Sequence, residues 1–495
     1  MILQTVDPVY PCRHPDLEGH KAQKTVYVQG SLLQPSVDKI APGNNDQPSL
    51  MERAMFRPVP LWLLILTIVL GVVVTIVFGA LVLKPPRQKQ VQETVLALAN
   101  VPFVLKQTVK SITKVPRGYA PPPYQPLPEG LWRNPDQPFV DEGYVLVRAF
   151  DEHLKRSVVR LISLRDGTIV HQYAPDIRTM NSRSTFSSAL IDLRRDRDAR
   201  RNLMMHPLLM PDGGIVIHDS SPLARFDACG HMQWMIDGIF HHSLERDGDG
   251  NLWAAFRYPK AKVPDVGPLF EDESVMKVSP DGKILHEARI VDILDSNQLG
   301  WLWRGRPYTD DPFHLNDVQP VLKSGPYWQA GDLFISLRNL SLVMLYRPTT
   351  GKVLWWKANF SHMQHDVSII DDHRIAVFDN NWRVAAPEGE VDGFNRVAIY
   401  DFATDSASYP LDDAMKKLRV HTRAQGRATP LPNGDFMIEE TEGGRLMRIA
   451  PDGTVRWRYI AAMPSMRRLQ LRWSRYVDPV RNQEAITLAK DVKCN

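Results

Sequence analysis

Histidine residues recur in this sequence shortly before predicted β-hairpin turns. His365 opens an apolar run that ends at the turn Asp371-Asp372, and His241-His242 stands before another strand and turn. The same arrangement recurs at His206 and at Gln425-Gly426-Arg427. The separation of about six to eight residues is roughly one strand length, so we expect these polar groups at one end of a repeated hairpin unit. Imidazoles gathered in this way serve as nucleophiles, as hydrogen-bond donors to anions or as metal ligands.

Three imidazoles and one guanidinium form the candidate site: His242, His314, His365 and Arg338. Arg338 follows the predicted strand Leu333–Leu337, which pairs with the strand after His314. Hydrogen-bond donors beside a nucleophile suit an oxyanionic substrate. Three histidines also suit zinc or copper, but a guanidinium in the same pocket favours an anion over a dication. We therefore expect neither a metal nor another cofactor.

Short strands between glycine-containing turns are the elements that must position these side chains. One strand–turn–strand unit recurs at Arg165–Ile169, Ser279–Ile284, Thr349–Val353 and Ala450–Val455. Counted with the inner hairpins, these make six units, near residues 143–175, 206–237, 242–290, 314–357, 365–409 and 425–460. Units that bury their apolar faces only against neighbours close into a ring, so the sequence predicts an all-β fold, a six-bladed β-propeller. A β-sandwich is the main alternative, but it does not account for the repeated unit.

The innermost strand of each propeller blade lines a central channel. Polar groups at one end of these strands therefore meet, although they lie far apart in the sequence. We expect His242, His314 and His365 at corresponding positions of consecutive units, around a single pocket.

The N-terminal part contains one long apolar run. Residues 1–58 are interpreted as an unstructured tail, with Met51 as an alternative translation start. The uncharged run Leu61–Leu83 is long enough to cross a bilayer, and it predicts an uncleaved transmembrane signal anchor over residues 59–84. Basic residues flank both of its ends, so charge alone does not orient it.

A helix and a linker are expected next, over residues 85–139. Apolar residues recur with helical spacing within 88–115, and prolines follow from Pro116 to Pro138. The apolar helix face needs a partner, and the membrane, its own domain, another copy of the chain and a subunit of a membrane complex all remain open. The propeller is expected over 140–465 and a C-terminal extension over 466–495.

Composition places the chain among globular proteins, with 43% hydrophobic and 23% charged residues. A formal net charge of +4, without a basic stripe that carries stacking aromatics, gives no case for nucleic-acid binding. The three cysteines lack zinc-ligand spacing and exclude a disulfide framework. Whether Cys229 pairs with Cys494 is left open by the sequence.

Five phrases of the sequence resemble the PAPS-independent arylsulfate sulfotransferases. They are His241-His242 before a Gly-Asn-Leu turn, Phe313-His314-Leu315-Asn316, Ile335-Ser336-Leu337-Arg338-Asn339-Leu340, Gln364-His365-Asp366 with Phe378-Asp379-Asn380, and Gln425-Gly426 followed by Leu431-Pro432-Asn433-Gly434. Together they cover roughly residues 200–460, and their joint occurrence is more specific than any single phrase. The resemblance implies a six-bladed propeller that acts outside the cytoplasm.

The same resemblance implies roles for individual residues. His365 would be the nucleophile and form a transient sulfohistidine, while His242, His314 and Arg338 would hold the sulfuryl oxygens and the bridging phenolic oxygen. We further expect substrate-binding roles for Asn316, Gln364, Asn339, Gln425 and Arg427. A neutral imidazole attacks without a strong base, and fixed donors stabilise the charge that develops during transfer.

These expectations combine into a membrane-anchored arylsulfotransferase with its propeller in the periplasm and its anchor in the inner membrane. An aryl sulfate would be the donor and a phenol the acceptor. A non-catalytic scaffold, docked to an envelope complex through residues 88–115, is the main alternative. A third alternative is a propeller hydrolase or lyase for sulfated or acidic glycans, with water as the acceptor.

Overall fold

The computed structural model describes residues 60–83, 91, 94–95, 98–99, 101, 119–120, 128–139, 143–185, 202–267, 269–383, 390–461 and 468–494. The chain divides into two units, Met1–Arg87 and Gln88–Asn495. The predictions for residues 1–58 lie outside the described residues. Within 88–115 only isolated helical residues are described, so the amphipathic helix there stays a prediction.

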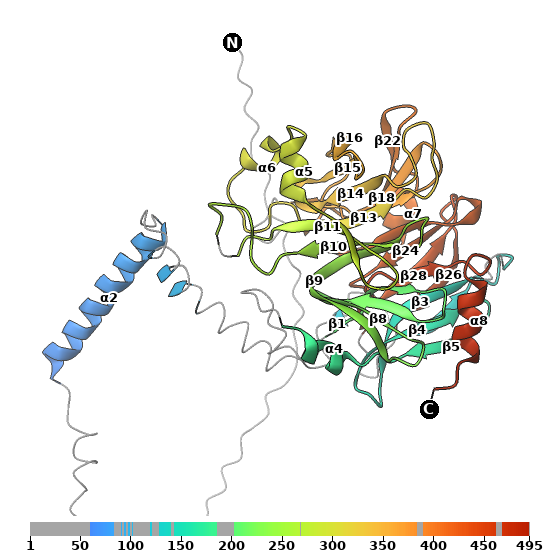
Figure 1. The fold of residues 1–495 in the computed structure, drawn as a ribbon, viewed down its shortest axis with the longest axis horizontal. Coiled ribbons are helices and arrows are strands. Elements are labelled where there is room, and N and C mark those ends of the chain that lie inside the picture. Colours follow the sequence, from blue (N-terminus) through green and yellow to red (C-terminus); the bar gives the residue numbers. More distant parts are fainter. Residues whose placement is uncertain are drawn as a thin grey trace, which may run out of the picture. The chain divides into compact units, whose positions relative to one another are not determined.

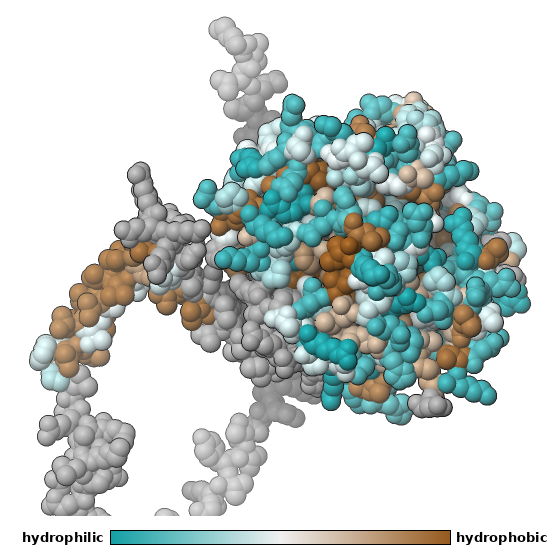
Figure 2. Space-filling model, in the orientation of Figure 1, coloured by the Kyte–Doolittle hydropathy of each residue, from teal (hydrophilic) through white to brown (hydrophobic). Residues whose placement is uncertain are grey.

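The first unit contains the helix α2, Leu61–Leu83. Among the described residues, Leu61–Val82 is the one helical segment long and apolar enough to span a membrane. Its side chains are exposed, and Figure 2 shows them as a continuous hydrophobic surface. The helix therefore has the length and composition of a membrane anchor or of a signal sequence.

The second unit is built mostly from antiparallel sheets, three of which have four strands each (Figure 1). The first is β28 (Arg475–Val477), β3 (Tyr144–Asp151), β4 (Arg156–Ser163) and β5 (Ile169–Tyr173). The second is β13 (Leu315–Pro320), β14 (Leu333–Leu337), β15 (Leu342–Arg347) and β16 (Lys352–Ala358). The third is β17 (His365–Ile369), β18 (Arg374–Asp379), β21 (Arg396–Asp401) and β22 (Ser406–Ser408).

Two larger sheets complete the set. A five-stranded sheet has the order β2 (Gly130–Arg133), β26 (Val455–Ile460), β25 (Arg445–Ile449), β24 (Phe436–Glu440) and β23 (Arg427–Pro430). A seven-stranded sheet has the order β12 (Ile284–Arg289), β11 (Glu273–Val278), β10 (Leu252–Arg257), β9 (Met232–Arg246), β8 (Ser221–Phe226), β7 (Ile215–His218) and β6 (Met205–Leu209). Two short pairs are β1 (Tyr119–Ala120) with β27 (Arg468–Leu469) and β19 (Trp382–Arg383) with β20 (Glu390–Val391).

Apart from the isolated helical residues before β1, the helices described in this unit are short, and all but the last of them lie between strands. They are α4 (Ile177–Arg183), α5 (Ile290–Ser296), α6 (Trp301–Arg304), α7 (Asp412–Lys417), α8 (Gln483–Asp491) and the single 3-10 turns Arg338–Leu340 and Pro432–Gly434. The Asp176 side chain caps α4 by accepting a hydrogen bond from the Thr179 amide.

The sheets follow one another in a propeller-like arrangement. The strands β6, β9, β13, β17 and β23 contact each other in succession, as the inner strands of a ring do. The strand β28, from the C-terminal end of the chain, pairs with β3 near the start of this unit. In Figure 1 the last sheet, with β24 and β26, lies beside β3 and β4. Such closure pairs strand edges that would otherwise be exposed.

Apolar side chains between neighbouring sheets form the core. Trp253 and Val275 of the seven-stranded sheet pack in one cluster with Ile335 of the next sheet. Val343 of that sheet packs in another cluster with Val377 of the sheet that follows. Each sheet is therefore stabilised by burial against its neighbours rather than against a shared centre.

The all-β, propeller-like arrangement agrees with the sequence prediction, but the division into six separate four-stranded sheets does not. The predicted units 206–237 and 242–290 belong to one seven-stranded sheet, because β9 runs unbroken from Met232 to Arg246. Gly238, which falls between these two predicted units, lies inside this strand. A Cβ atom there would come within 2.5 Å of the Phe256 ring, so close packing requires the glycine.

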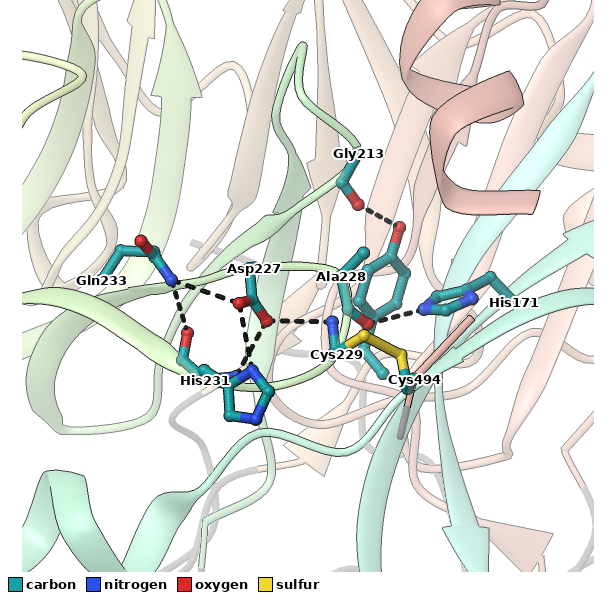
Figure 3. Close-up of a disulfide and its surroundings, with 9 residues drawn as sticks. His171, Gly213, Asp227, Ala228, Cys229, His231, Gln233 and Cys494 are labelled. Carbon is teal, nitrogen blue, oxygen red and sulfur yellow. Dashed lines mark hydrogen bonds and ion pairs between the residues drawn. A yellow bond between two sulfur atoms is a disulfide. The ribbon is translucent and has the colours of Figure 1, made fainter. Parts of the chain in front are cut away.

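A disulfide joins Cys229, in the turn between β8 and β9, to Cys494 after α8 (Figure 3). This answers the question that the sequence left open. The bond closes a loop across a sequence separation of 265 residues. Close to it, the His171 Nε2 donates a hydrogen bond of 2.8 Å to the Ala228 carbonyl.

We expect Cys494→Ser to lower the free energy of unfolding by about 2–5 kcal/mol, because a long cross-link restricts the unfolded chain. Denaturant unfolding of the oxidised full-length protein in detergent measures this change. Cys12→Ser, which leaves the disulfide intact, is the matched control. Equal unfolding midpoints for the Cys494→Ser protein and the wild type would contradict a stabilising role.

Candidate active site

A residue in the left-handed backbone conformation lies near the start of each of β6, β13, β17, β23 and β28, and another lies inside the long strand β9. These residues are His206 (φ 48°), His242 (φ 54°), His314 (φ 52°), Asp366 (φ 55°), Gln425 (φ 64°) and Trp473 (φ 62°). Strand register shifts accompany several of them, between Met205 and Leu208, between Leu315 and Asp317 and between His365 and Val367. A β-bulge re-aims the side chains around it, so these strand ends turn their polar groups towards one another.

Three of the predicted side chains meet at these strand ends. One ring nitrogen from each of His242, His314 and His365 lies within 4.8 Å of the other two. The His242 ring centroid lies 5.1 Å from that of His314 and 5.9 Å from that of His365. His365 is the residue before the left-handed position, not in it, so its match to His242 and His314 is one residue out of register. Its imidazole nevertheless reaches the same cluster.

Asn380 determines which nitrogen of the neutral His365 ring carries the proton. The Asn380 amide group donates to the Thr422 and Gln425 carbonyls, which turns its Oδ1 towards His365 Nδ1 at 2.6 Å. Because Oδ1 is an acceptor, the proton of the neutral ring lies on Nδ1 and the lone pair on Nε2. The backbone N–H of Gln425 donates to His365 Nε2 at 3.2 Å, a distance at the long end of the hydrogen-bond range.

The other two imidazoles are each held through Nδ1. His314 Nδ1 lies 2.5 Å from Asp311 Oδ2, and His242 Nδ1 lies 3.0 Å from His241 Nδ1. Their Nε2 atoms are therefore the nitrogens left for a ligand. Buried His365 has no solvent exposure, whereas His242 and His314 are half-buried, so a ligand reaches His365 past these two rings.

Arg338 lies beside the cluster, at the end of β14. Its Nη1 donates to Asn339 Oδ1 at 2.8 Å, and Asn339 Nδ2 donates to the Asp311 carbonyl at 2.8 Å. These bonds hold the guanidinium near the His314 side of the site, and its charge acts on both His365 and Asp311. A fixed cation next to neutral imidazoles suits an anionic ligand.

Burial favours the neutral form of His365 and His242. It places the pKa of His365 well below its usual value, and the Arg338 charge adds to the effect. Burial likewise lowers the pKa of His242, with further repulsion from His314 and His241. Burial raises the pKa of the Asp311 carboxyl, but the hydrogen bond from His314 and the charges of His314, Arg257 and Arg338 together outweigh it, and the pKa is lowered. The neutral form of His365, whose Nε2 has a lone pair that faces only the long contact with the Gln425 backbone amide, is therefore favoured.

The remaining predicted residues have supporting positions. Gln364 Nε2 donates to the Ser336 hydroxyl and the Leu342 carbonyl, so this side chain ties two strands together. Asn316 Nδ2 donates to the Gln364 carbonyl at 2.7 Å, while its buried Oδ1 lacks a protein partner among the described residues. The Gln425 Oε1 is also buried and unpartnered within that described part. Asn316 and Gln425 thus retain free acceptors, whereas Gln364 and Asn339 do not.

Arg427, expected to bind substrate, has buried protein partners for its guanidinium instead. Its Nε donates to Asp366 Oδ1 at 2.9 Å, Nη1 contacts His206 Nε2, and Nη2 lies 3.5 Å from Glu245 Oε1. The residue is 4% exposed. Its carboxylate partners come from strands far apart in the chain, so this network links inner strands across the ring.

We expect Arg427→Met to lower the free energy of unfolding by about 3–5 kcal/mol, because it leaves Asp366 and Glu245 buried without their counter-charge. Denaturant unfolding of the full-length protein measures this loss. Arg423→Met removes an exposed pair with Glu442 and should cost less than about 1 kcal/mol. Unchanged stability of Arg427→Met together with a raised KM would support a substrate contact instead.

Four residues at the site were not among those predicted. Asn380 appears within a phrase that resembles the family, and His241 and Asp311 stand next to predicted residues, so spacing offered a weak signal for them. Trp473 offered none, because it falls in the predicted C-terminal extension. Its ring centroid lies 6.2 Å from that of His365 and 6.1 Å from that of His242, and it forms one wall of the cluster.

The fold and the cluster together define a class: a propeller-like protein with three imidazoles and a guanidinium gathered at its inner strands. Within that class the chain resembles the arylsulfotransferases (ASST), and the model of that family matches residues 217–462. No curated protein matches the chain.

The solved structures that match the chain have low sequence identity and TM-scores below 0.5. A protein of unknown function from Bacteroides caccae is 12% identical, with a TM-score of 0.42, and the alignment covers 68% of this chain and 99% of that one. For a catalytically inactive virginiamycin B lyase from Staphylococcus aureus, identity is 9% and the TM-score 0.37, over 69% and 98% of the two chains. TolB from Acinetobacter baumannii is 12% identical with a TM-score of 0.36, over 79% and 73%.

Proposed function

We propose that the protein transfers a sulfuryl group from an aryl sulfate to a phenol through a sulfohistidine at His365. The observation that carries the proposal is the protonation pattern of the cluster: Asn380 directs the proton of His365 to Nδ1, which leaves the Nε2 lone pair beside two further imidazoles and Arg338. The match of residues 217–462 to the arylsulfotransferases supports it.

The transfer occurs in two displacements. His365 Nε2 attacks sulfur, the bond from sulfur to the aryl oxygen breaks, and the departing phenolate takes up a proton. The oxygen of the acceptor phenol then attacks sulfur, the N–S bond breaks, and the phenol proton is released. His242, His314 and Arg338 stabilise the sulfuryl oxygens and the departing oxygen, whose charge grows in the transition state.

His365 is fully buried, so its attack on a substrate requires the rings around it to shift. His242 and His314 are the half-buried members of the cluster and lie on the path. The Gln425 amide, 3.2 Å from Nε2, must give up its contact when the N–S bond forms. Asn316 and Gln425 have free acceptors that suit the hydroxyl group of a phenol.

The test is a donor–acceptor exchange assay on the full-length protein. With 4-nitrophenyl sulfate, steady release of nitrophenolate should require an added phenol, and the sulfated phenol should accumulate in equal amount. Release at the same rate with water alone would indicate a hydrolase, and no release across a broad panel of aryl sulfates would favour the scaffold.

A metal centre is a second candidate, favoured by the same three histidines. Each has its Nδ1 held by a neighbouring side chain, as metal-binding imidazoles commonly have. The guanidinium of Arg338 beside them opposes a dication. We expect sulfuryl transfer to survive dialysis against a chelator unchanged. A loss restored by added zinc or copper would establish the metal centre instead.

We also propose that α2 anchors the protein in the inner membrane and that the propeller lies in the periplasm. The disulfide between Cys229 and Cys494 supports this placement, since such bonds form in oxidising compartments. Protease protection in spheroplasts tests it. Digestion of the second unit by external protease is expected, and full protection would contradict the placement.

The ring is proposed to have six blades, with the seven-stranded sheet counting as two that share β9. In support, the first part of β9 pairs with β8 and its second part pairs with β10. The left-handed residue at six inner strand ends agrees with six repeats.

A further inference from the structure

Two buried residues behind His242 have no part in the proposed displacements. They are His241, 5% exposed, and Glu273, 2% exposed. The His241 ring is perpendicular to that of His242, and their Nδ1 atoms lie 3.0 Å apart. On its other side, His241 Nε2 lies 3.5 Å from Glu273 Oε1. The three side chains thus form a continuous row from the interior of the sheet to the histidine cluster.

The contact between the two Nδ1 atoms couples the two rings. One Nδ1 must carry a proton and the other must accept it, so a neutral His241 and a neutral His242 cannot choose their tautomers independently. When His241 donates, His242 carries its proton on Nε2 and is a donor towards the cluster. When His242 donates, its Nε2 is an acceptor. The state of His241 therefore decides which role His242 has.

Glu273 in turn faces the other nitrogen of His241. Its Oε2 accepts a hydrogen bond of 2.6 Å from the Leu315 amide, which fixes the carboxyl and leaves Oε1 for His241. His241 Nε2 is buried and has no hydrogen-bond partner in the described part of the chain, so it is available to exchange a proton when the 3.5 Å gap tightens.

Several charges surround this carboxyl. Burial, Asp311 and Glu271 raise the pKa of Glu273 well above its usual value, whereas the Leu315 amide and Arg257 act against this rise. On the other side of the row, burial, Arg257 and His314 lower the pKa of His241, with a smaller effect from His218. Both shifts favour the state in which Glu273 is the protonated acid and His241 is neutral over the ion pair of the two side chains.

We propose that Glu273, His241 and His242 form a proton relay that switches His242 Nε2 between donor and acceptor in the two halves of the transfer. The inference rests on the proposed sulfuryl transfer. In the first half, Glu273 gives its proton to His241 Nε2, His241 Nδ1 gives its own to His242 Nδ1, and His242 Nε2 protonates the departing aryl oxygen. In the second half, His242 Nε2 takes the proton of the acceptor phenol and each shift reverses. Protons balance over the cycle without an external acid or base.

A cation site is the other use of these carboxylates. Oxygens of Glu271, Glu273 and Asp311 lie within 4.8 Å of one another. Arg257 already pairs with Glu271, however, and so brings the positive charge that a cation would supply. A relay uses the neutral acid at Glu273, whereas a cation would require it ionised.

The test compares two donors on Glu273→Gln in the full-length protein. The glutamine carbonyl can still accept from Leu315, and its amide donates to His241 Nε2 but cannot pass a proton on. A departing 4-nitrophenolate is stable without a proton, whereas a departing phenolate is not. We expect kcat/KM for phenyl sulfate to fall at least about tenfold further than kcat/KM for 4-nitrophenyl sulfate, as loss of a general acid predicts. Glu287→Gln, on the exposed face of β12, should affect both donors alike and weakly.

Equal losses for both donors, or no loss for either, would overturn the relay while leaving the sulfuryl transfer intact. If Glu273→Gln does not fold, the two donors can be compared on the wild-type protein instead. Its solvent deuterium isotope effect should be larger with phenyl sulfate than with 4-nitrophenyl sulfate, and equal effects would count against the relay. Wild-type protein without turnover on either donor would mean that the proposed function fails, and the relay with it.

Discussion

His365→Ala is expected to lower kcat/KM for 4-nitrophenyl sulfate by at least about 10³-fold, because it removes the nucleophile and leaves only the stabilising donors. The comparison is a steady-state assay with a fixed phenol acceptor, on full-length protein in detergent. The side chain is buried, so unfolding midpoints must accompany the rates and show that the variant is folded.

The same hairpin offers a matched control. His373 lies in the turn between β17 and β18, at the other end of the strands from His365, and its Nδ1 faces the Asp372 carboxylate. We expect His373→Ala to keep kcat/KM within about twofold, because surface substitutions of this kind are usually mild. If His365→Ala retained more than about a tenth of the wild-type rate, the nucleophile would have to be another residue.

Acid should unfold the protein steeply between about pH 6.5 and 5. Burial is the main cause of a lowered pKa at five histidines: His206, His218, His241, His242 and His365. It lowers the pKa of His218 to about 3. In the unfolded chain each binds a proton near pH 6.5. Their contribution to stability is therefore complete above pH 6.5 and is lost as the pH falls below it.

Buried carboxyls act in the opposite direction. Burial and the Asp366 charge raise the pKa of Asp317 to about 7, and the pKa of Glu273 is raised well above its usual value. These groups bind protons in the folded state and offset part of the contribution of the five imidazoles, as do Glu271, Asp272 and Asp379, whose pKa values burial also raises. Each imidazole that is not offset contributes a loss of about 1.4 kcal/mol per pH unit, and we expect a net loss of at least that order.

Denaturant unfolding of the full-length protein at pH 7.5, 6.5, 5.8 and 5.2 measures this slope. His218→Phe removes one buried imidazole that lies outside the transfer site. It should reduce the slope of the unfolding free energy against pH by the contribution of one proton, about 1.4 kcal/mol per pH unit. A flat profile between pH 6.5 and 5.2 would show that these histidines are solvated and protonated in the folded protein.

Much of the site could be predicted because its signal is local. His242 and His365 each lie roughly one strand length before a hairpin turn, and the turn residues identify which strand end they occupy. His314 was placed by its corresponding position in the unit between them. Ring geometry then requires His242, His314 and His365 to meet, as they do. Arg338 was found in the same way, from its place after the strand that pairs with β13.

Other features depend on contacts between segments far apart in the chain. Gly238 resembles a turn residue, and only the Phe256 ring packed on it shows why it lies within β9. The guanidinium of Arg427 resembles an anion-binding group until Asp366 and Glu245 are seen beside it. Trp473 reaches the cluster only because β28 returns to pair with β3.

The most direct test of the covalent intermediate is intact-mass analysis of the full-length protein after brief mixing with 4-nitrophenyl sulfate in the absence of a phenol. The account predicts an adduct of one sulfuryl group, mapped by peptide fragmentation to His365, that disappears when a phenol is added. An adduct on another residue, or turnover in the presence of phenol with no adduct at any mixing time, would contradict it.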